Sequence, residues 1–360
     1  MKVVLLAGAN SIHSINWANS LSSKKIEVHL ISIHKLNGKL NDAVYLHTLS
    51  KIAPWGYISA YSEVKELLKT IKPDIVNAHY ATGYGLLARL VNYKPTILSV
   101  WGSDVYSFPK KSVLHKLFLK GNLKSATAIA STSHCMAKTT LETYPHEHIF
   151  ITPFGINEEK FKPYPIKPSR KNSFVIGTVK ALEDTYGIDT LLRAFSEVVK
   201  CYSGHLTLIL EITGEGSDRE KLSILSKTLE IHDKVIFKGF IEHSKVPATI
   251  NRLDIYVALS RFESYGVAIL EASSCEKPVV VSDADGPSEV TIDGVTGFIV
   301  PKESPKAAAN AILKLIYNPS LRKDMGKAGR QHILSNYTLE KSTNMMIDAY
   351  QKTIILNNEC

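Results

Sequence analysis

Apolar residues along this chain fall into short continuous runs, and stretches with helical periodicity separate the runs. Continuous rather than alternating apolar residues indicate strands that are buried on both faces, so we expect parallel sheets. The predicted strands of the first half are Val3–Leu6, Val28–Ser32, Ile75–Ala78, Thr96–Val100, Ala128–Ser131 and Ile149–Thr152.

The second half of the chain repeats this pattern. Its predicted strands are Phe174–Val179, Leu206–Ile212, Val235–Lys238, Ile255–Ala258, Val279–Ser282 and Phe298–Val300. Helical periodicity is clearest in Ile188–Lys200, Asp218–Glu230 and Lys306–Tyr317. Strand and helix alternate twice over, which predicts an α/β protein of two doubly wound, Rossmann-like domains.

The best candidate for a linker between the two domains is a proline-rich stretch. Residues 157–171 carry three prolines among charged residues and suit neither a regular strand nor an uninterrupted helix. We therefore expect an N-terminal domain over 1–160, a linker over 161–171 and a C-terminal domain over 172–338. By its pattern alone, the last helical stretch, 339–356, fits either half.

Composition narrows the class of protein further. The 360 residues are 44% hydrophobic and 21% charged, as expected for two globular domains. No apolar run reaches the roughly 18 residues of a membrane span, and no signal-peptide cleavage pattern follows Met1, so we expect a cytoplasmic protein. The four cysteines are scattered, as is typical of reduced thiols. The net charge of +9 favours an anionic partner without choosing one.

Two carboxylates stand eight residues apart in "RFESYGVAILEASS", where Glu263 precedes and Glu271 lies within a predicted helix, Val267–Ser274. The loop before that helix follows a predicted strand, where parallel sheets hold their ligands. Gly266 permits a close backbone approach, and the N-terminus of the helix suits a diphosphate. If the stretch is helical, the carboxylates lie about 10 Å apart along the axis, which fits a nucleotide sugar. The alternative is an exposed glutamate followed by an ordinary helical one.

The same stretch carries a family resemblance. "FESYGVAILEASSCEKPVVVSDADGPSEV", with "TGFIVP" after it, resembles the glutamate-x7-glutamate motif of the retaining glycosyltransferases of family 4. "DIVNAHYATGYGLLA", "SVWGSDVYSFP", "ITPFGIN", "GTVKALEDTYGIDTLLRAF" and "ITGEGSDREKL" match that family in the same order. The resemblance covers nearly the whole chain. It implies a GT-B fold, in which two Rossmann-like domains face a cleft and the last helix crosses back to the first domain.

The resemblance also implies roles on the donor side. Glu271 would bind the ribose hydroxyls, Glu263 would face the donor sugar, and Lys180 would neutralise the leaving diphosphate. The other expected donor-side residues are Tyr265, Gly266 and Val267, through their backbone N–H groups, together with Gly214 and Gly8.

Around Lys180 the chain departs from the family pattern. The family usually has an arginine after this strand and a lysine a few residues later. This chain has Lys180 at the first position and Tyr186 at the second, so one of the two cations is missing. Arg193 and Arg261 are candidates for the missing charge. The alternative for Lys180 is an ordinary solvated side chain.

The N-terminal half supplies the expected acceptor side. Gly8 is followed by "ANSIH" rather than by a Gly-rich dinucleotide fingerprint, which weakens an oxidoreductase interpretation. The resemblance places Gly8 and Asn10 near the leaving group and the acceptor. His13 is a candidate acceptor contact, or a structural histidine at the start of a helix.

Trp101 is the most consequential departure. Many members of the family have a histidine here that helps to position the donor sugar, whereas Trp101 can only stack or form a wall of the pocket. Asp104 matches the family and is a candidate to bind a hydroxyl in catalysis. His79 is then the nearest candidate imidazole, or a structural histidine at a strand end.

A metal is not expected. "DAD", at Asp283 to Asp285, looks like a metal-binding motif of another glycosyltransferase fold, but it lies where the GT-B family has a glycine turn. We therefore expect a metal-independent transferase that uses a nucleotide sugar in envelope polysaccharide or glycolipid synthesis, with no nucleic-acid partner. The alternatives are a nucleotide-sugar epimerase or hydrolase on this fold, and a non-catalytic two-domain binding protein.

The segment 109–126 suggests where an acceptor is presented. It combines a basic stripe with an apolar stripe, namely Lys116, Lys120 and Lys124 beside Val113, Leu114, Leu117 and Phe118. Such a helix is typical of proteins that dock on an anionic membrane surface, here the inner face. The alternative is a surface helix whose apolar stripe packs on its own domain.

Overall fold

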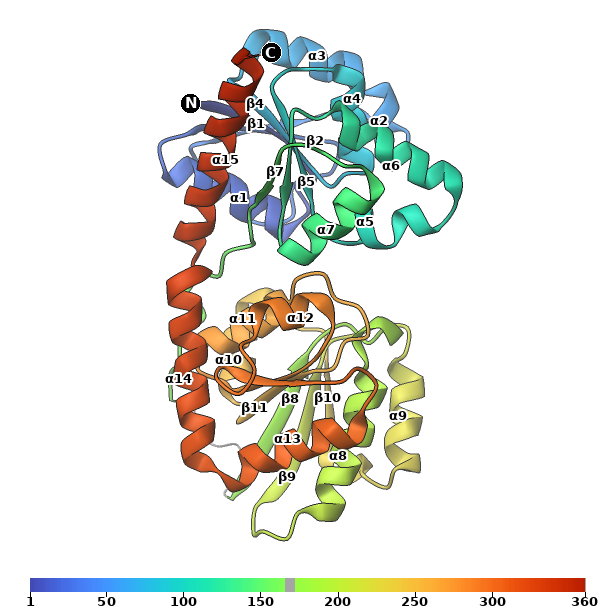
Figure 1. Cartoon of the computed structure of the whole chain (residues 1–360), viewed down its shortest axis with the longest axis vertical. Helices are drawn as coiled ribbons and strands as arrows, with labels where there is room; N and C mark the ends of the chain where they lie inside the picture. The colour runs from blue at the N-terminus through green and yellow to red at the C-terminus, as the bar shows by residue number, and fades with distance from the viewer. Residues whose placement is uncertain (166–171, 360) are drawn as a thin grey trace. The chain divides into compact units, whose positions relative to one another are not determined.

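The computed structural model describes residues 1–165 and 172–359, and the chain forms two compact units. The first unit comprises residues 1–155 and the C-terminal segment from Leu339, and the second comprises residues 156–338. The chain therefore leaves the first unit once and returns to it for its last helix (Figure 1).

The first unit is built on a parallel sheet. Within the described residues its seven strands lie in the order β3-β2-β1-β4-β5-β6-β7, and every pairing is parallel. The strands are β1 (Lys2–Leu6), β2 (Glu27–Ser32), β3 (Val44–Thr48), β4 (Ile75–His79), β5 (Thr96–Val100), β6 (Ala128–Ser131) and β7 (Ile149–Ile151). Strand β3 was not expected from the sequence, because this edge strand has a single buried residue, Val44, and lacks a continuous apolar run.

Helices cover both faces of this sheet. They are α1 (Ile12–Ser23), α2 (Gly56–Ser59), α3 (Tyr61–Ile71), α4 (Gly83–Val91), α5 (Ser103–Tyr106), α6 (Val113–Ser125), α7 (His134–Thr143) and α15 (Leu339–Glu359). Helices α3, α4 and α6 share one hydrophobic core with the sheet, with Leu68, Leu87 and Leu123 among its buried residues. Helix α15 contacts α1, β5 and β6 (Figure 1).

The second unit repeats this arrangement. Its six described strands lie in the order β10-β9-β8-β11-β12-β13 and pair in parallel. They are β8 (Ser173–Val179), β9 (Thr207–Thr213), β10 (Val235–Gly239), β11 (Ile255–Ala258), β12 (Val279–Ser282) and β13 (Gly297–Val300). Strands β8 and β11 are neighbours, so the loops that follow them lie at the same edge of the sheet.

Helices also flank the second sheet (Figure 1). They are α8 (Ile188–Cys201), α9 (Arg219–Thr228), α10 (Val246–Asn251), α11 (Val267–Ser274), α12 (Asp285–Val290), α13 (Pro305–Tyr317) and α14 (Pro319–Asn336). Helices α8 and α13 pack together in the main core, where Phe195 and Ile312 are fully buried. Helices α10 and α14 contact α11, the helix that carries Glu271.

The first boundary differs from the expectation by a few residues. It lies after Gly155 rather than after residue 160, because the N–H of Ile156 donates to the carbonyl of Tyr337 (2.8 Å) in the second unit. Within the predicted linker, Phe161 is only 2% exposed and packs in the second unit. Residues 166–171 of that linker lie outside the described residues.

No helix in the described part of the chain is both long enough and apolar enough to cross a membrane.

Candidate active site

Lys180 and Glu263 form a buried ion pair at the carboxyl edge of the second sheet. Lys180 directly follows β8, and Glu263 lies in the loop after β11. The ammonium group contacts Oε1 of Glu263, whose Oε2 accepts a hydrogen bond from Oγ of Ser260 (2.8 Å). The two side chains are 9% and 10% exposed, so Lys180 is not the solvated side chain of the alternative interpretation.

The surroundings of Lys180 keep it charged. Burial alone lowers the pKa of a lysine, but the nearby Glu263 carboxylate outweighs burial and raises the pKa of Lys180 above its ordinary value. Nζ also lies 5.0 Å from the ring centroid of Tyr186, within the range of a cation–π contact. The tyrosine that replaces the family's second cation thus contacts the first.

Helix α11 begins directly after the Glu263 loop. Its N-cap, Gly266, has a φ of +100°, a conformation that L side chains rarely adopt. Tyr265 is 3% exposed, so it anchors the turn, and the first backbone N–H groups of the helix have no partner within it. The N-terminus of α11, which includes Val267, is therefore suited to an anion.

Gly214 lets strand β9 end close to Lys180. Its φ is +139°, and a Cβ there would lie 1.9 Å from the carbonyl oxygen of Lys180. Its N–H donates to the carbonyl of Gly239 (2.9 Å) at the end of β10. Gly214 therefore shapes the backbone beside the ion pair.

Glu271 lies on α11 and is 6% exposed. Its Oε1 lies 3.0 Å from Nε2 of His243, and Nδ1 of His243 lies 2.9 Å from Nζ of Lys160. Sequence reasoning assigned no role to His243 or Lys160. Both come from turns with no motif of their own, and only their contacts identify them.

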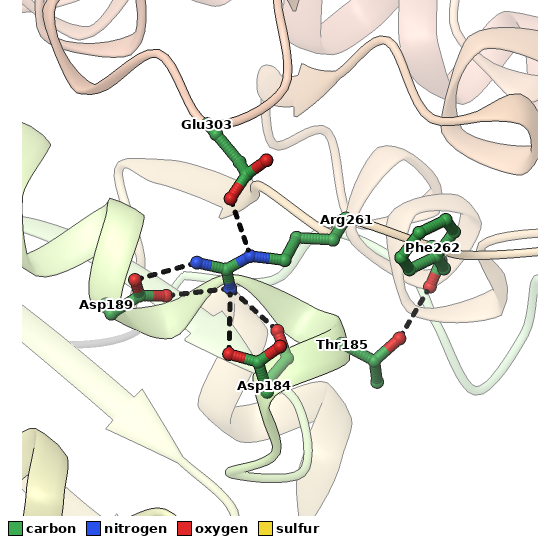
Figure 2. A network of polar contacts seen from close by, with 6 residues as sticks. All are labelled: Asp184, Thr185, Asp189, Arg261, Phe262 and Glu303. Atoms are coloured by element: carbon green, nitrogen blue, oxygen red, sulfur yellow. Dashed lines mark hydrogen bonds and ion pairs between the residues drawn. The ribbon is translucent and has the colours of Figure 1, made fainter.

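Arg261 holds the Glu263 loop to the start of α8 (Figure 2). Its guanidinium forms two hydrogen bonds with the Asp189 carboxylate, at 2.9 and 2.8 Å, and one with Glu303 at 3.0 Å. It also donates to the carbonyl of Asp184 at 2.7 Å. Arg261 is thus committed to acidic partners and does not supply the missing phosphate-binding charge. The other candidate, Arg193, is exposed on α8.

The two aspartates of the "DAD" motif lie in a backbone turn and at the start of a helix. Oδ1 of Asp283 accepts the N–H of Lys302 (2.8 Å), and Asp285 begins α12. Among residues 1–165 and 172–359, no group of three His, Cys, Asp or Glu side chains could hold a metal ion. Metal independence remains a prediction.

In the first unit, the structure places Asp104, the expected catalytic residue, in the short helix α5 after β5. It is fully buried, and its carboxylate accepts the backbone N–H groups of Ala81 (2.8 Å), Gly102 (2.8 Å) and Trp101 (3.2 Å). Burial raises the pKa of Asp104, although these N–H groups oppose the rise. Asp104 therefore ties together the turns after β4 and β5.

His79 is also buried. At the end of β4 it is 1% exposed, and its Nε2 lies 3.1 Å from Oδ1 of Asn77. That oxygen also accepts a hydrogen bond from Tyr350 of α15 (2.8 Å). Burial, with a smaller effect of His13, lowers the pKa of His79 to about 3. His79 is therefore neutral at physiological pH and has a structural setting.

Trp101 joins His79 to an aromatic group at the same sheet edge. The ring centroids of Trp101 and His79 are 4.6 Å apart, and those of Trp101 and Phe154 are 5.3 Å apart. His13 stacks on Phe154 at 4.1 Å. Phe154 was not among the predicted site residues, although its position just after β7 puts it at this edge.

Gly8 and Asn10 form the turn after β1. The N–H of Ser11 donates to the carbonyl of Gly8 (3.0 Å), which leads the chain into α1 and towards His13. A Cβ at Gly8 would lie 2.7 Å from Oδ1 of Asn10, and Asn10 itself is exposed. The first unit thus gathers Gly8, Asn10, His13 and Trp101 at the carboxyl ends of its strands.

Two Rossmann-like units, each with a parallel sheet, are the architecture of the GT-B class of fold. The second unit has a buried Lys–Glu pair beside the N-terminus of a helix. Sequence comparison agrees: residues 2–133 match the family "Glycosyl transferase 4-like", and residues 159–332 match "Glycosyl transferases group 1". The chain therefore belongs to the glycosyltransferases with the GT-B fold.

Relatives cover most of this chain. The capsular polysaccharide biosynthesis glycosyltransferase CapM of Staphylococcus aureus is 28% identical over 345 residues, 88% of each chain. The N-acetyl-alpha-D-glucosaminyl L-malate synthase of Bacillus anthracis is 22% identical over 358 residues, 93% of this chain and 91% of its own.

Solved structures share the fold. Sucrose-phosphate synthase from Thermosynechococcus elongatus superposes with a TM-score of 0.82 at 16% identity, over 99% of each chain. HepE from Anabaena, solved with UDP and glucose, superposes with a TM-score of 0.78 at 16% identity, over 98% of this chain and 100% of its own. At these identities the likeness establishes the fold.

Proposed function

We propose that this glycosyltransferase is a retaining enzyme that moves a sugar from a nucleotide diphosphate sugar to an acceptor hydroxyl. The observation that carries the proposal is the buried pair of Lys180 and Glu263 beside the start of α11, with Glu271 on the same helix. The complexes of HepE with UDP and with UDP-glucose support this class of donor. Retention rests on the resemblance of the glutamate-x7-glutamate motif to family 4.

In this proposal the second unit holds the donor. Glu271 binds the ribose hydroxyls, and the backbone N–H groups of Tyr265, Gly266 and Val267 bind the diphosphate. Lys180 adds a full positive charge, since its pKa lies above the ordinary value. When the diphosphate binds, it replaces Glu263 as the ion-pair partner of the Lys180 ammonium, and Glu263 turns towards the donor sugar.

The reaction exchanges one bond of the anomeric carbon for another. The bond from that carbon to the diphosphate oxygen breaks, and a bond to the acceptor oxygen forms on the same face of the sugar. The acceptor proton passes to a phosphate oxygen of the leaving group. Lys180 and the N-terminus of α11 stabilise the negative charge that develops on that group, so neither a metal nor a protein base is required. The products are the glycosylated acceptor and a nucleoside diphosphate.

We assign the acceptor to the first unit. The side chains of His13 and Asn10 and the half-buried ring of Trp101 lie at the strand ends where an acceptor would bind. A sugar ring packs well on an aromatic face, and a hydroxyl finds donors and acceptors in His13 and Asn10. Envelope polysaccharide or glycolipid synthesis is the proposed setting, and the name of CapM supports it.

Helix α6 supports docking on an anionic membrane surface. Its residues Leu119 and Leu123 are buried, whereas Val113, Leu114 and Leu117 are 74%, 76% and 58% exposed. With about 100° per residue, these three lie on the side of the helix away from the buried pair. The apolar stripe named from the sequence thus does not pack on its own unit, except for the half-buried Phe118.

The charges near this exposed stripe fit such a partner. Lys116, Lys120 and Lys124 are exposed on the same helix. Each lysine near an anionic bilayer contributes about 1 kcal/mol of attraction. We therefore propose that α6 brings the chain to the inner membrane face, where a lipid-linked acceptor is presented.

The decisive experiment screens nucleotide sugars with and without candidate acceptors. Transferase activity releases a nucleoside diphosphate only together with a glycosylated acceptor. A hydrolase instead releases free sugar at the same rate without acceptor, and an epimerase changes the sugar without releasing nucleotide. A binding protein shows affinity without turnover. Any of these three results, with acceptors of the envelope classes present, contradicts the proposal.

A further inference from the structure

Glu271 is one end of a chain of three polar side chains in the second unit. His243 begins a short 3-10 turn, His243–Lys245, and Lys160 belongs to the first segment of the unit. The imidazole ring of His243 bridges the other two side chains. Its Nε2 lies 3.0 Å from Oε1 of Glu271, and its Nδ1 lies 2.9 Å from Nζ of Lys160. The bridge joins an ammonium group to a carboxylate through one imidazole.

The chemistry of the two end groups determines where the imidazole proton lies. An ammonium group can only donate hydrogen bonds, so Nδ1 of His243 accepts from Lys160. A carboxylate can only accept, so Nε2 of His243 carries the proton and donates to Glu271. In this arrangement the imidazole proton lies on Nε2, and Nδ1 is the acceptor. Lys160 polarises the ring and strengthens the bond to Glu271.

Phe161 fixes the position of both partners. Nζ of Lys160 lies 5.6 Å from the centroid of this ring, and the ring of His243 lies at 5.7 Å. The carbonyl of Phe161 accepts hydrogen bonds from Ser274 of α11 (2.5 Å) and from Arg330 of α14 (3.1 Å). The segment with Lys160 is thus anchored to the helix that carries Glu271.

We propose that His243 is a positioning residue for the donor ribose, with Lys160 fixing its tautomer. The hydrogen bond from His243 occupies one oxygen of Glu271 and sets the plane of the carboxylate, so its remaining lone pairs point at the 2′ and 3′ hydroxyls. His243 acts through Glu271 and does not take part in the transfer of the sugar. This inference rests on the proposed function, because it requires Glu271 to bind ribose.

The test separates ribose recognition from general binding. The affinities of UDP, GDP and ADP are measured by calorimetry on the full chain, and the tightest is compared with its 2′,3′-dideoxy analogue. In His243→Ala we expect the ribonucleotide to bind about 10-fold more weakly, because a misplaced Glu271 loses one charge-assisted hydrogen bond to the ribose. Binding of the dideoxy analogue should change little. His243→Gln, which keeps an N–H donor, should recover most of the loss.

Lys160→Met should give a smaller loss that also depends on the ribose hydroxyls. Lys162→Met is the matched control, because Lys162 is an exposed lysine two residues further on whose ammonium pairs with Glu159 (3.0 Å). This control should bind both ligands as the wild type does. Lys160→Met and His243→Gln also keep the test valid if His243→Ala folds poorly.

The outcomes that overturn the inference are distinct from those that overturn the proposed function. Equal weakening of both ligands in His243→Ala means that His243 has only a structural role. If the wild type binds the two ligands equally, Glu271 does not contact the ribose and this inference fails. The proposed sugar transfer is then judged separately, by its activity assay. A wild type that binds no nucleoside diphosphate and transfers no sugar overturns both.

Discussion

The ammonium group of Lys180 is paired with the carboxylate of Glu263, although the two residues are 83 positions apart in the chain. The pair balances the positive charge of a lysine side chain that is only 9% exposed. Breaking such a pair by removing one partner is costly, because the other charge stays buried. Its two members should therefore respond differently to substitution.

Removal of the Lys180 ammonium or of the Glu271 carboxylate should weaken use of the donor. Lys180→Ala and Glu271→Ala should each lower kcat/KM for the nucleotide sugar roughly 10- to 150-fold, because each loses about 1.5–3 kcal/mol of charge-assisted bonding. Steady-state kinetics with a varied donor checks this. Lys200→Ala, at an exposed lysine of α8, is the control. Wild-type donor kinetics in either variant would rule out the assignment.

Removal of the negative charge should have the opposite effect on product binding. Glu263→Gln leaves Lys180 without its counter-ion, so a nucleoside diphosphate should bind several-fold tighter, by about 1 kcal/mol. Sugar transfer should nevertheless become slower, because Glu263 no longer faces the donor sugar. Calorimetry with UDP, GDP and ADP, together with initial rates, measures both effects.

The control for this variant is Glu220→Gln, which removes the same charge from an exposed position on α9. It should change neither quantity. Weaker diphosphate binding in Glu263→Gln would show that Glu263 holds Lys180 in place rather than competing with the phosphate.

The contacts of Arg261 predict a pH-dependent stability. Burial raises the pKa of Asp189, but the Arg261 guanidinium outweighs it and holds that pKa below its ordinary value of 3.8. The stability from this pair is therefore complete above that value and is lost as the pH falls through the lower, folded-state pKa. Arg261→Met should cost about 2 kcal/mol at pH 7, and the difference from wild type should shrink below about pH 4.

Denaturant unfolding at pH 7 and near pH 3 measures this difference. Arg252→Met serves as the control, since Arg252 is exposed and its guanidinium makes a long contact with Thr249 (3.5 Å). A pH-independent loss in Arg261→Met would mean that the arginine stabilises through the packing of its stem and not through its charge.

Docking through α6 should depend on salt and on charge. Lys116→Gln, Lys120→Gln and Lys124→Gln combined should strongly reduce co-sedimentation with anionic vesicles, since about 3 kcal/mol of attraction is removed. Val113→Ser, Leu114→Ser and Leu117→Ser combined should reduce it as well, by removing the apolar contact. The matched control replaces three exposed lysines of the second unit, Lys221, Lys323 and Lys327. Equally weak binding of the wild type to anionic and neutral vesicles would refute docking and leave the transferase proposal unaffected.

Activity should persist in excess chelator. The proposed charge stabilisation comes from Lys180 and the start of α11, and a metal has no part in it. Initial rates with and without EDTA, on protein whose folding is checked by circular dichroism, decide this. Loss of activity that magnesium or manganese restores would return Asp283 and Asp285 to consideration as ligands.

The sequence predicts most of the sheet architecture because buried parallel strands are marked by their own residues. Every strand built from a continuous apolar run is present, whereas β3 lacks such a run and was missed. The position of Lys180 and Glu263 at one sheet edge also follows from the order of the elements, since Lys180 directly follows β8 and Glu263 lies in the loop between β11 and α11.

The partners of the site residues could not be predicted in the same way. The contact of Glu271 with His243 joins a helix to a turn 28 residues away in the chain, and no local pattern records it. Asp104 shows the converse limit. Its motif match suggests catalysis, and neither its full burial nor its three backbone N–H donors is visible in the residues around it.

The Arg261 contacts have a consequence for protein engineering. The guanidinium of Arg261 pairs with Asp184 and Asp189 before and at the start of α8, and with Glu303 after β13 (Figure 2). The geometry of the Glu263 loop therefore depends on residues that lie outside the loop in the chain. Residues 261–271 are therefore not a portable cassette. If they were transplanted alone into another parallel sheet, both carboxylates would be present, but the acidic partners of Arg261 that hold the loop in position would be missing.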